Sequence, residues 1–331
     1  MRGQLSQNVA ARNGRGLFID CQKRTCDQFA RRAMHRIGQT IRPWLAILVG
    51  SAVALGIFAS NQLKAQQARA SSNQQDTVGS DENTGQDFTS PENLFQLRYQ
   101  YKTSPGTGSA KGSIRTVTTD TLYLRSDFTF DLGSPWKVVF RSDLPFVAKD
   151  PISSDHPSGD YLYGVGDADF QAALIEQINQ RWAAGGGLRI IAPTGPDNIT
   201  SGKWQMMPIL GARTTLPELS DGSYFEGLVR YDLSFAGDPT KKNISNLQLD
   251  PMLNISLPDH WFFTLYPSAD IRVNFGDPVT GQTGRLFLPF DFSVGRVLTK
   301  YFTVSFEVGV PIIRDYPVYD FKTTTRLNLK F

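Results

Sequence analysis

Apolar and polar side chains alternate along most of the chain after residue 92, and the C-terminal segment shows this most clearly. Over residues 319–331, the odd positions hold Tyr, Phe, Thr, Leu and Phe, whereas the even positions hold Asp, Lys, Thr, Arg and Asn. A period of two residues places successive side chains on opposite faces of a β-strand. We therefore expect a two-faced strand here, longer than the usual length of about five or six residues.

The same alternation recurs upstream, and the connections between the alternating segments are by turns longer and mostly shorter. This arrangement is typical of an up-and-down antiparallel barrel, which has short turns at one end and longer loops at the other. An even number of strands also brings both chain ends to the same side. The twelve predicted strands are residues 95–102, 122–131, 136–146, 163–175, 182–192, 204–214, 223–236, 247–257, 261–275, 285–297, 301–312 and 319–331.

Two architectures contain such strands. In a soluble sandwich or jelly roll the apolar face packs into the core, whereas in a membrane barrel it meets lipid and the polar face lines the lumen. The strand lengths suit a tilted crossing of the membrane, and the chain ends on Phe331, as outer-membrane barrels do. We predict an all-β, transmembrane, outer-membrane-type barrel. Aromatic residues expected at its two interfaces are Trp136, Trp182, Trp204, Trp261, Tyr301, Tyr319 and Phe331.

The N-terminal region contains an apolar run from Trp44 to Ala59, with basic residues before it and a stretch rich in Ala and Gln after it. This order is typical of a secretory signal peptide, and cleavage after Ala65 or after Ala70 fits the small residues there. Met34 is an alternative start. The competing interpretation is an uncleaved anchor, although the run is shorter than the roughly 20 residues that span a bilayer.

Residues 71–92 are polar and hold almost no apolar side chains, so they cannot build a core. The predicted organisation is a basic leader with signal peptide over 1–65, a flexible polar arm over 66–92 and the barrel over 93–331. The arm is long enough to reach into the lumen as a plug.

The net charge is informative only when the N-terminal region and the barrel region are counted separately. The chain has 34 basic and 31 acidic residues. Residues 1–70 hold 11 of the basic and 2 of the acidic ones, so residues 71–331 hold 23 basic and 29 acidic residues. A net negative body argues against nucleic-acid binding. Both cysteines, Cys21 and Cys26, lie in the leader, and no further Cys or nearby His completes a metal or redox site.

The polar strand faces supply the candidate functional residues, and they carry both signs of charge. Salt-bridged side chains can fill a narrow barrel, or opposite charges can frame a small pore; the sequence leaves both open. The predicted lumen-lining residues are Arg98, Arg125, Asp127, Lys137, Arg141, Asp167, Asp169, Arg230, Asp232, Asp250, Asp270, Arg272, Glu307, Arg326 and Lys330.

A family resemblance rests on three short motifs, which are Gly164-Val165-Gly166-Asp167, Trp182-Ala183-Ala184-Gly185-Gly186-Gly187 and Pro193-Thr194-Gly195. With these motifs, residues 91–331 resemble the outer-membrane barrel family labelled for the meta-pathway of phenol degradation. The resemblance implies a barrel associated with uptake of small, often aromatic or apolar compounds. It supplies no catalytic residues.

Catalysis is the weaker hypothesis. His156 has Ser and Asp neighbours in one predicted loop, but catalytic triads converge from separate elements. His260 lies in a tight Pro-Asp turn. Two pairs of acids on one strand face suit acid–base work or Ca²⁺ binding, but also a polar lumen. These pairs are Asp127 with Asp131 and Asp167 with Asp169.

The function expected from these features is a channel or transporter in the bacterial outer membrane for passive passage of small solutes. No cofactor is implied, and the expected partners are outer-membrane lipids, the solutes, and the barrel-assembly machinery through the strand ending in Phe331. The alternatives are a structural or adhesive barrel with a filled lumen and, more remotely, a barrel lipid hydrolase.

Overall fold

The structure is a computed structural model, and it describes residues 87–105, 116–133, 135–151, 161–279 and 281–331. Every described residue belongs to one compact unit. The predicted leader and signal peptide lie outside the described residues. In the described part, no helix is long and apolar enough to cross a membrane.

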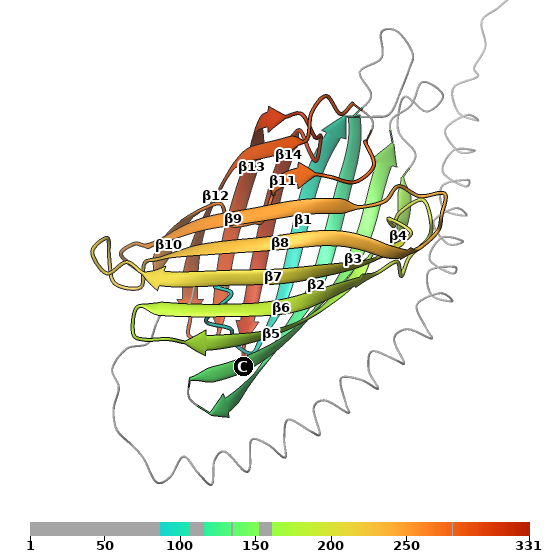
Figure 1. The fold of residues 1–331 in the computed structure, drawn as a ribbon. Helices are drawn as coiled ribbons and strands as arrows, with labels where there is room; N and C mark the ends of the chain where they lie inside the picture. The colour runs from blue at the N-terminus through green and yellow to red at the C-terminus, as the bar shows by residue number, and fades with distance from the viewer. Residues whose placement is uncertain (1–86, 106–115, 134, 152–160, 280) are drawn as a thin grey trace, which may run out of the picture. The chain divides into compact units, whose positions relative to one another are not determined.

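Strands account for all of the regular structure in the described residues, as the alternation predicts (Figure 1). The strands are β1 (Leu94–Pro105), β2 (Thr116–Gly133), β3 (Trp136–Pro151), β4 (Leu162–Val165), β5 (Ala168–Gln177), β6 (Trp182–Ala192), β7 (Lys203–Thr215), β8 (Tyr224–Gly237), β9 (Ser245–Ser256), β10 (Trp261–Leu265), β11 (Ile271–Asn274), β12 (Leu286–Thr299), β13 (Phe302–Arg314) and β14 (Phe321–Lys330).

The fourteen strands form twelve barrel positions. β4 and β5 both pair with β3, and β10 and β11 both pair with β9 and β12, so each of these two pairs is one interrupted strand. Every pairing is antiparallel, and β1 pairs with β14, which closes the sheet. The prediction of a closed, twelve-stranded antiparallel barrel of outer-membrane type is confirmed.

The barrel has two distinct ends. The turn end, as we call it, holds the connections β2–β3, β5–β6, β7–β8, β9–β10 and β12–β13, together with the start of β1 and the finish of β14. The opposite end, the loop end, holds the remaining connections. The two ends therefore differ as the alternating connection lengths predict.

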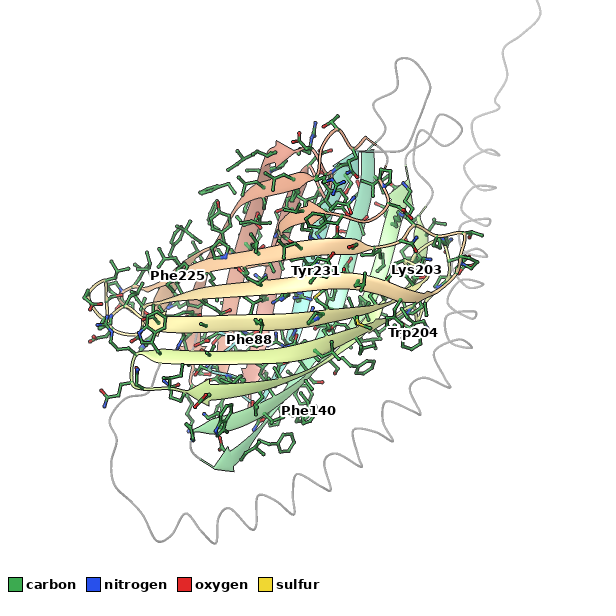
Figure 2. The ribbon with its side chains drawn as sticks, in the orientation of Figure 1. Phe88, Phe140, Lys203, Trp204, Phe225 and Tyr231 are labelled. Atoms are coloured by element: carbon green, nitrogen blue, oxygen red, sulfur yellow. The ribbon has the colours of Figure 1, made fainter. Side chains whose placement is uncertain are left out.

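The barrel wall is apolar outside and polar inside. On β14, Lys322 and Arg326 are 0% and 2% exposed, whereas Phe321 and Leu329 are 38% and 51% exposed. Figure 2 shows Phe140 and Trp204 on the outer side of the wall. A soluble sandwich would bury the apolar face instead, so the structure contradicts that alternative.

Two strands predicted to be continuous are interrupted. The segment 261–275 breaks between β10 and β11, where Tyr266 has a φ of 52° and Ala269, expected on the outer face, is buried. Pro267 lies in the break and Pro289 faces it on β12, and neither residue can donate a backbone hydrogen bond to a ladder. The segment 163–175 also breaks, between β4 and β5.

The aromatic residues expected at the membrane interfaces lie exposed on the outer wall with one exception. Trp136, Trp182, Trp204, Trp261, Tyr301 and Phe331 are all exposed on the wall. Tyr319 is 0% exposed, so its assignment to an interfacial position was wrong. It precedes β14 and turns inward, where its hydroxyl donates to Asp291 Oδ1 at 2.7 Å and its ring meets Phe287 edge-on.

Candidate functional site

The enclosed inner face of the barrel is the candidate site, and its two sides differ. The inward positions of β5 to β8 are small or apolar around Ala173, Gly185, Gly187, Gly211 and Leu228; we call this surface the glycine wall. The inward positions of β1 to β3 and β11 to β14 carry most of the buried charges, and we call this surface the charged wall. Strand alternation produces both the glycine wall and the charged wall, because every second residue of each strand points inward.

Lys322 is the centre of the largest buried charge group, the lysine cluster. Its ammonium pairs with Asp270, with Glu307 and, at 3.0 Å, with Asp291. Arg326 pairs with the other oxygen of Glu307. The neighbouring strands β12, β13 and β14 and the break before β11 contribute these residues, so the pairing of these strands brings them together.

The three carboxylates of the lysine cluster lie close enough for metal ligation, since one oxygen of each lies within 4.8 Å of the others. The Lys322 ammonium already bonds to all three. It places a positive charge where a bound cation would lie, and Arg326 adds a second. The geometry is therefore that of a neutralised salt-bridge cluster.

A second group of ion pairs, the arginine cluster, links β1, β2 and β3. Arg125 donates two hydrogen bonds to the Asp143 carboxylate, of 2.7 and 2.6 Å, and Arg141 donates two to the Asp127 carboxylate, of 2.9 and 2.6 Å. Arg98 reaches Asp143 at 3.5 Å. Bidentate guanidinium–carboxylate pairs are strong and directional, so these side chains hold fixed positions.

The inner face also has polar positions with incomplete hydrogen bonding on β8, on β9 and just before β5, which we call the polar strip. Four buried atoms, Asp167 Oδ1, Arg230 Nε, Asn246 Oδ1 and Asp250 Oδ1, have no hydrogen-bond partner among the described residues. Buried polar atoms are nearly always satisfied by protein or by water. This strip can therefore hold water, and so can positions on the charged wall such as Gln96 and Arg326, which also have buried atoms without a hydrogen-bond partner among the described residues.

The predicted lumen-lining residues fall into two groups. Lys137 and Lys330 lie at the turn end; Lys137 is about half exposed, 4.0 Å from Asp131, and Lys330 pairs with Glu92 at 2.7 Å. The others are buried or half-buried at inward-facing positions, and they are Arg98, Arg125, Asp127, Arg141, Asp167, Asp169, Arg230, Asp232, Asp250, Asp270, Arg272, Glu307 and Arg326.

The paired acids have structural partners. Asp127 bonds to Arg141, and Asp169 lies 3.6 Å from Arg189. Asp167 accepts the Ser201 backbone N–H at 2.9 Å. Asp127 and Asp169 thus face basic side chains, whereas Asp167 is held by a backbone N–H.

The sequence reasoning missed several functional candidates, and strand parity was the signal that would have found them. Lys322 has the same inward parity as the predicted Arg326 on β14, whereas Asp291 and Arg189 lie at inward positions of β12 and β6, where no lumen-lining residue was predicted. Asp87, Arg213 and Glu226 form a further group, described below. Asp87 had no such signal, because it lies outside any strand.

The residues considered for catalysis do not converge in the described part of the chain. His260 lies in the β9–β10 turn with a φ of 62°, and its carbonyl accepts the Val297 N–H. His156 and its Ser and Asp neighbours lie outside the described residues.

The rim of the turn end carries exposed charges as well. Arg181 in the β5–β6 turn pairs with Glu218 in the β7–β8 turn at 2.6 Å. Two hydrogen bonds to the Glu218 carboxylate lower its pKa. The larger effect comes from the backbone N–H of Glu218 itself, and the next from the Arg181 guanidinium.

No protein-family model and no curated protein matches the chain. Among solved structures, it is similar to the COG4313 outer membrane channel from Pseudomonas putida F1, with a TM-score of 0.58 and 16% identity over 75% of this chain and 98% of that one. It also matches the beta domain of the Bordetella autotransporter BrkA, with a TM-score of 0.47 and 10% identity over 73% of this chain and 100% of that one. The Ralstonia pickettii toluene transporter TbuX gives a TM-score of 0.36 and 9% identity over 73% and 90%. The similarity to the first of these is one of fold.

Proposed function

We propose that the chain is an outer-membrane channel through which small solutes pass passively, selected by the charges of its inner face. The observation that carries the proposal is the polar strip inside a closed barrel. Its buried polar atoms have no hydrogen-bond partner in the described part of the protein, so they need water to satisfy them. A water-filled interior is what a channel requires. The fold shared with an outer membrane channel supports the same conclusion.

The route we propose runs along the polar strip. Arg230 and Asp250 face this strip from neighbouring strands. Because their charges are opposite, they favour small polar or neutral solutes over either ion type alone. The apolar glycine wall, together with the family resemblance, extends the proposal to apolar and aromatic compounds. The mechanism involves no cofactor.

The proposed location is the bacterial outer membrane, reached with a cleaved signal peptide. The exposed apolar band would contact the lipids. The strand that ends in Phe331, with its ring exposed and stacked on Phe95 at 5.0 Å, would be the segment that the assembly machinery recognises.

A structural barrel with a filled lumen is the second candidate. One observation favours it, which is the complete burial of Lys322, Asp291 and Glu307 in the lysine cluster. Charged side chains packed this closely obstruct part of the cross-section.

Single-channel recording separates the two candidates. The full-length protein is folded in detergent, inserted into planar bilayers, and checked for folding by its resistance to unfolding in detergent on a gel. Discrete and reproducible current steps support the channel. A folded, inserted and silent barrel contradicts it and favours the structural role.

A further inference from the structure

Residues Asp87–Glu92, which we call the strap, cross the inside of the barrel at its turn end. The strap begins against the inner faces of β6 and β7, where Phe88 packs on Gly185 and Gly211 (Figure 2). It ends at β1, which starts with Leu94. On the shorter way around the ring, β2, β3, β5 and β6 lie between β1 and β7. The strap therefore runs from one side of the mouth almost to the opposite side.

Glycines make the site that receives Phe88. A Cβ added at Gly185 would lie 3.1 Å from the Phe88 ring, and one added at Gly211 would lie 3.2 Å from it. Ile175 and Leu228 close the sides, and Phe88 is only 6% exposed. An added Cβ would therefore crowd the ring, and it would lie 2.8 Å from the Leu174 carbonyl oxygen at Gly185 or from Leu228 Cδ1 at Gly211. The glycine wall is thus shaped to hold this side chain.

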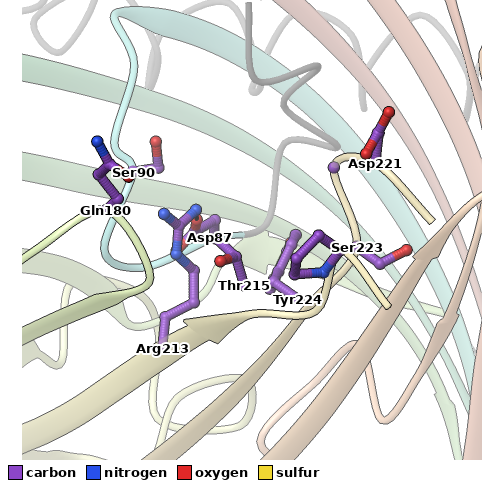
Figure 3. A pocket seen from close by; sticks show the side chains of 10 residues that line it. Asp87, Ser90, Gln180, Arg213, Thr215, Asp221, Ser223 and Tyr224 are labelled. Carbon is purple, nitrogen blue, oxygen red and sulfur yellow. Dashed lines mark hydrogen bonds and ion pairs between the residues drawn. The ribbon is translucent and has the colours of Figure 1, made fainter. Parts of the chain in front are cut away.

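Polar contacts hold the strap beside Phe88. Asp87 Oδ2 lies 2.5 Å from Arg213 Nη1, and both side chains are almost fully buried (Figure 3). The Phe88 backbone N–H donates to Glu226 Oε2 at 2.8 Å. The Thr89 backbone N–H donates to Asp87 Oδ1 at 2.7 Å. The buried Asp87 carboxylate is therefore paired with the buried Arg213 guanidinium.

Arg213 has a second carboxylate within reach. Arg213 on β7 and Glu226 on β8 are direct cross-strand neighbours, and both side chains face inward. Such neighbours have Cβ atoms about 4.5–5.5 Å apart. If the strap leaves, Arg213 can pair with Glu226, so the penalty of a buried, unpaired charge is avoided. The wall is thus built for two arrangements of Arg213.

Space for movement lies next to the strap. A cavity of about 210 Å³ is lined by Asp87 and Ser90 of the strap, by Arg213 and Tyr224, and by the β7–β8 turn residue Asp221. The cavity means that the strap is not packed on all sides.

We infer that the strap is a displaceable gate that closes the turn end of the channel, and that the exchange of Arg213 between Asp87 and Glu226 is its switch. The inference rests on the proposed channel function. In the closed state Phe88 occupies the glycine wall and Arg213 holds Asp87. In the open state the strap is out of the mouth and Arg213 holds Glu226.

The first experiment records single channels of the full-length protein, of three test variants and of one control variant. Asp87→Asn and Phe88→Ala weaken the closed state, and each should raise the open-to-closed ratio about tenfold, as expected for the loss of one charged hydrogen bond or one buried ring. Glu226→Gln keeps an oxygen that can accept the Phe88 N–H. It removes the negative charge that Arg213 would pair with in the open state, so it should lower the ratio. Phe140→Ala, a matched change on the outer wall, should leave it unchanged.

The opposite signs of Asp87→Asn and Glu226→Gln are the decisive result, because general loosening of the barrel would move both in one direction. Wild-type conduction with no effect of Asp87→Asn or Phe88→Ala overturns the gate and leaves the channel standing. If neither the wild-type protein nor any variant conducts current although the barrels are inserted, both the channel proposal and the gate proposal are overturned.

A second measurement follows the strap without any current. Thr89→Cys, in a chain with Cys21 and Cys26 changed to Ser, is treated with a water-soluble maleimide, with exposed Leu219→Cys as the control. The gate predicts that Cys at 89 reacts far more slowly than Cys at 219, and that adding Asp87→Asn accelerates it. Equal rates at the two positions overturn the gate, whatever the currents show.

Discussion

The two walls of the barrel interior solve the same packing problem in opposite ways. On the charged wall, long side chains such as Lys322 and Arg326 reach across the interior and neutralise acids on other strands. On the glycine wall, Gly185 and Gly211 leave room, and the strap enters from outside the sheet to fill it. The alternation of residues determines which face of a strand points inward, but residue volume determines what occupies the space in front of it.

The two walls should also fail differently. The charged wall depends on matched charges, so removing one partner leaves others buried and unpaired. The glycine wall depends on close approach of backbone and strap, so added volume is harmful there. The following predictions test this difference, beginning with the largest effect on stability.

Lys322→Met should be the most damaging single change. It leaves Asp270, Asp291 and Glu307 without their shared cation, and we expect a loss of about 3–5 kcal/mol in the free energy of unfolding. Denaturant unfolding of the barrel in detergent measures it. Lys137→Met is the matched control, because its exposed pair with Asp131 should contribute at most about 1 kcal/mol. Equal losses in the two variants would contradict the role of the lysine cluster.

Gly187→Ala tests the glycine wall by adding one carbon atom. The new Cβ would lie 2.4 Å from the Ala172 carbonyl oxygen and 2.7 Å from Ala173 Cβ, so the sheet must shift. We expect a destabilisation of about 1–3 kcal/mol in the same unfolding assay. At Gly227, the nearest atom is 3.8 Å away, and Gly227→Ala should change stability by about 0.5 kcal/mol or less. If both variants unfold alike, close approach on this wall is not what matters.

Phe331→Ala removes an aromatic contact outside both walls and sets a baseline for them. Its ring stacks on Phe95 at 5.0 Å, and the stacking should contribute about 0.5–1.5 kcal/mol to unfolding. Assembly into the outer membrane in cells should fall more than this loss of stability explains, if the terminal residue is also a recognition signal. Unchanged assembly would remove that proposed partner.

Arg230→Gln should have little effect on stability and a clear effect on selectivity. The side chain faces the polar strip, where its Nε has no partner among the described residues. Losing a positive charge from the route should shift the reversal potential under a salt gradient toward cation preference. Arg181→Gln, in an exposed turn, should leave the reversal potential nearly unchanged. The same reversal potential in Arg230→Gln and wild type would place the route elsewhere.

The sequence predicted the strands well because their period depends on local geometry alone. For example, β6 (Trp182–Ala192) has the predicted limits, and β13 (Phe302–Arg314) lies close to the predicted 301–312. The alternation did not predict the break between β10 and β11, because Pro267 interrupts the ladder only where the chain bends inward and Ala269 becomes buried. The inward position of Tyr319 was not predicted for a related reason, since its hydroxyl meets Asp291 only when β12, β13 and β14 have paired.

By itself, the sequence determined the all-β class, the number of barrel positions and the polar character of the inner face, because a strand places alternate side chains on opposite faces wherever it lies. Only the tertiary structure decided the pairs, because register and closure set which strands are neighbours: Arg125 meets Asp143 rather than another inward acid. The strap is the extreme case. Nothing near Asp87 in the chain predicts Arg213, and the contact exists only because the ring closes and brings β7 across from the start of β1.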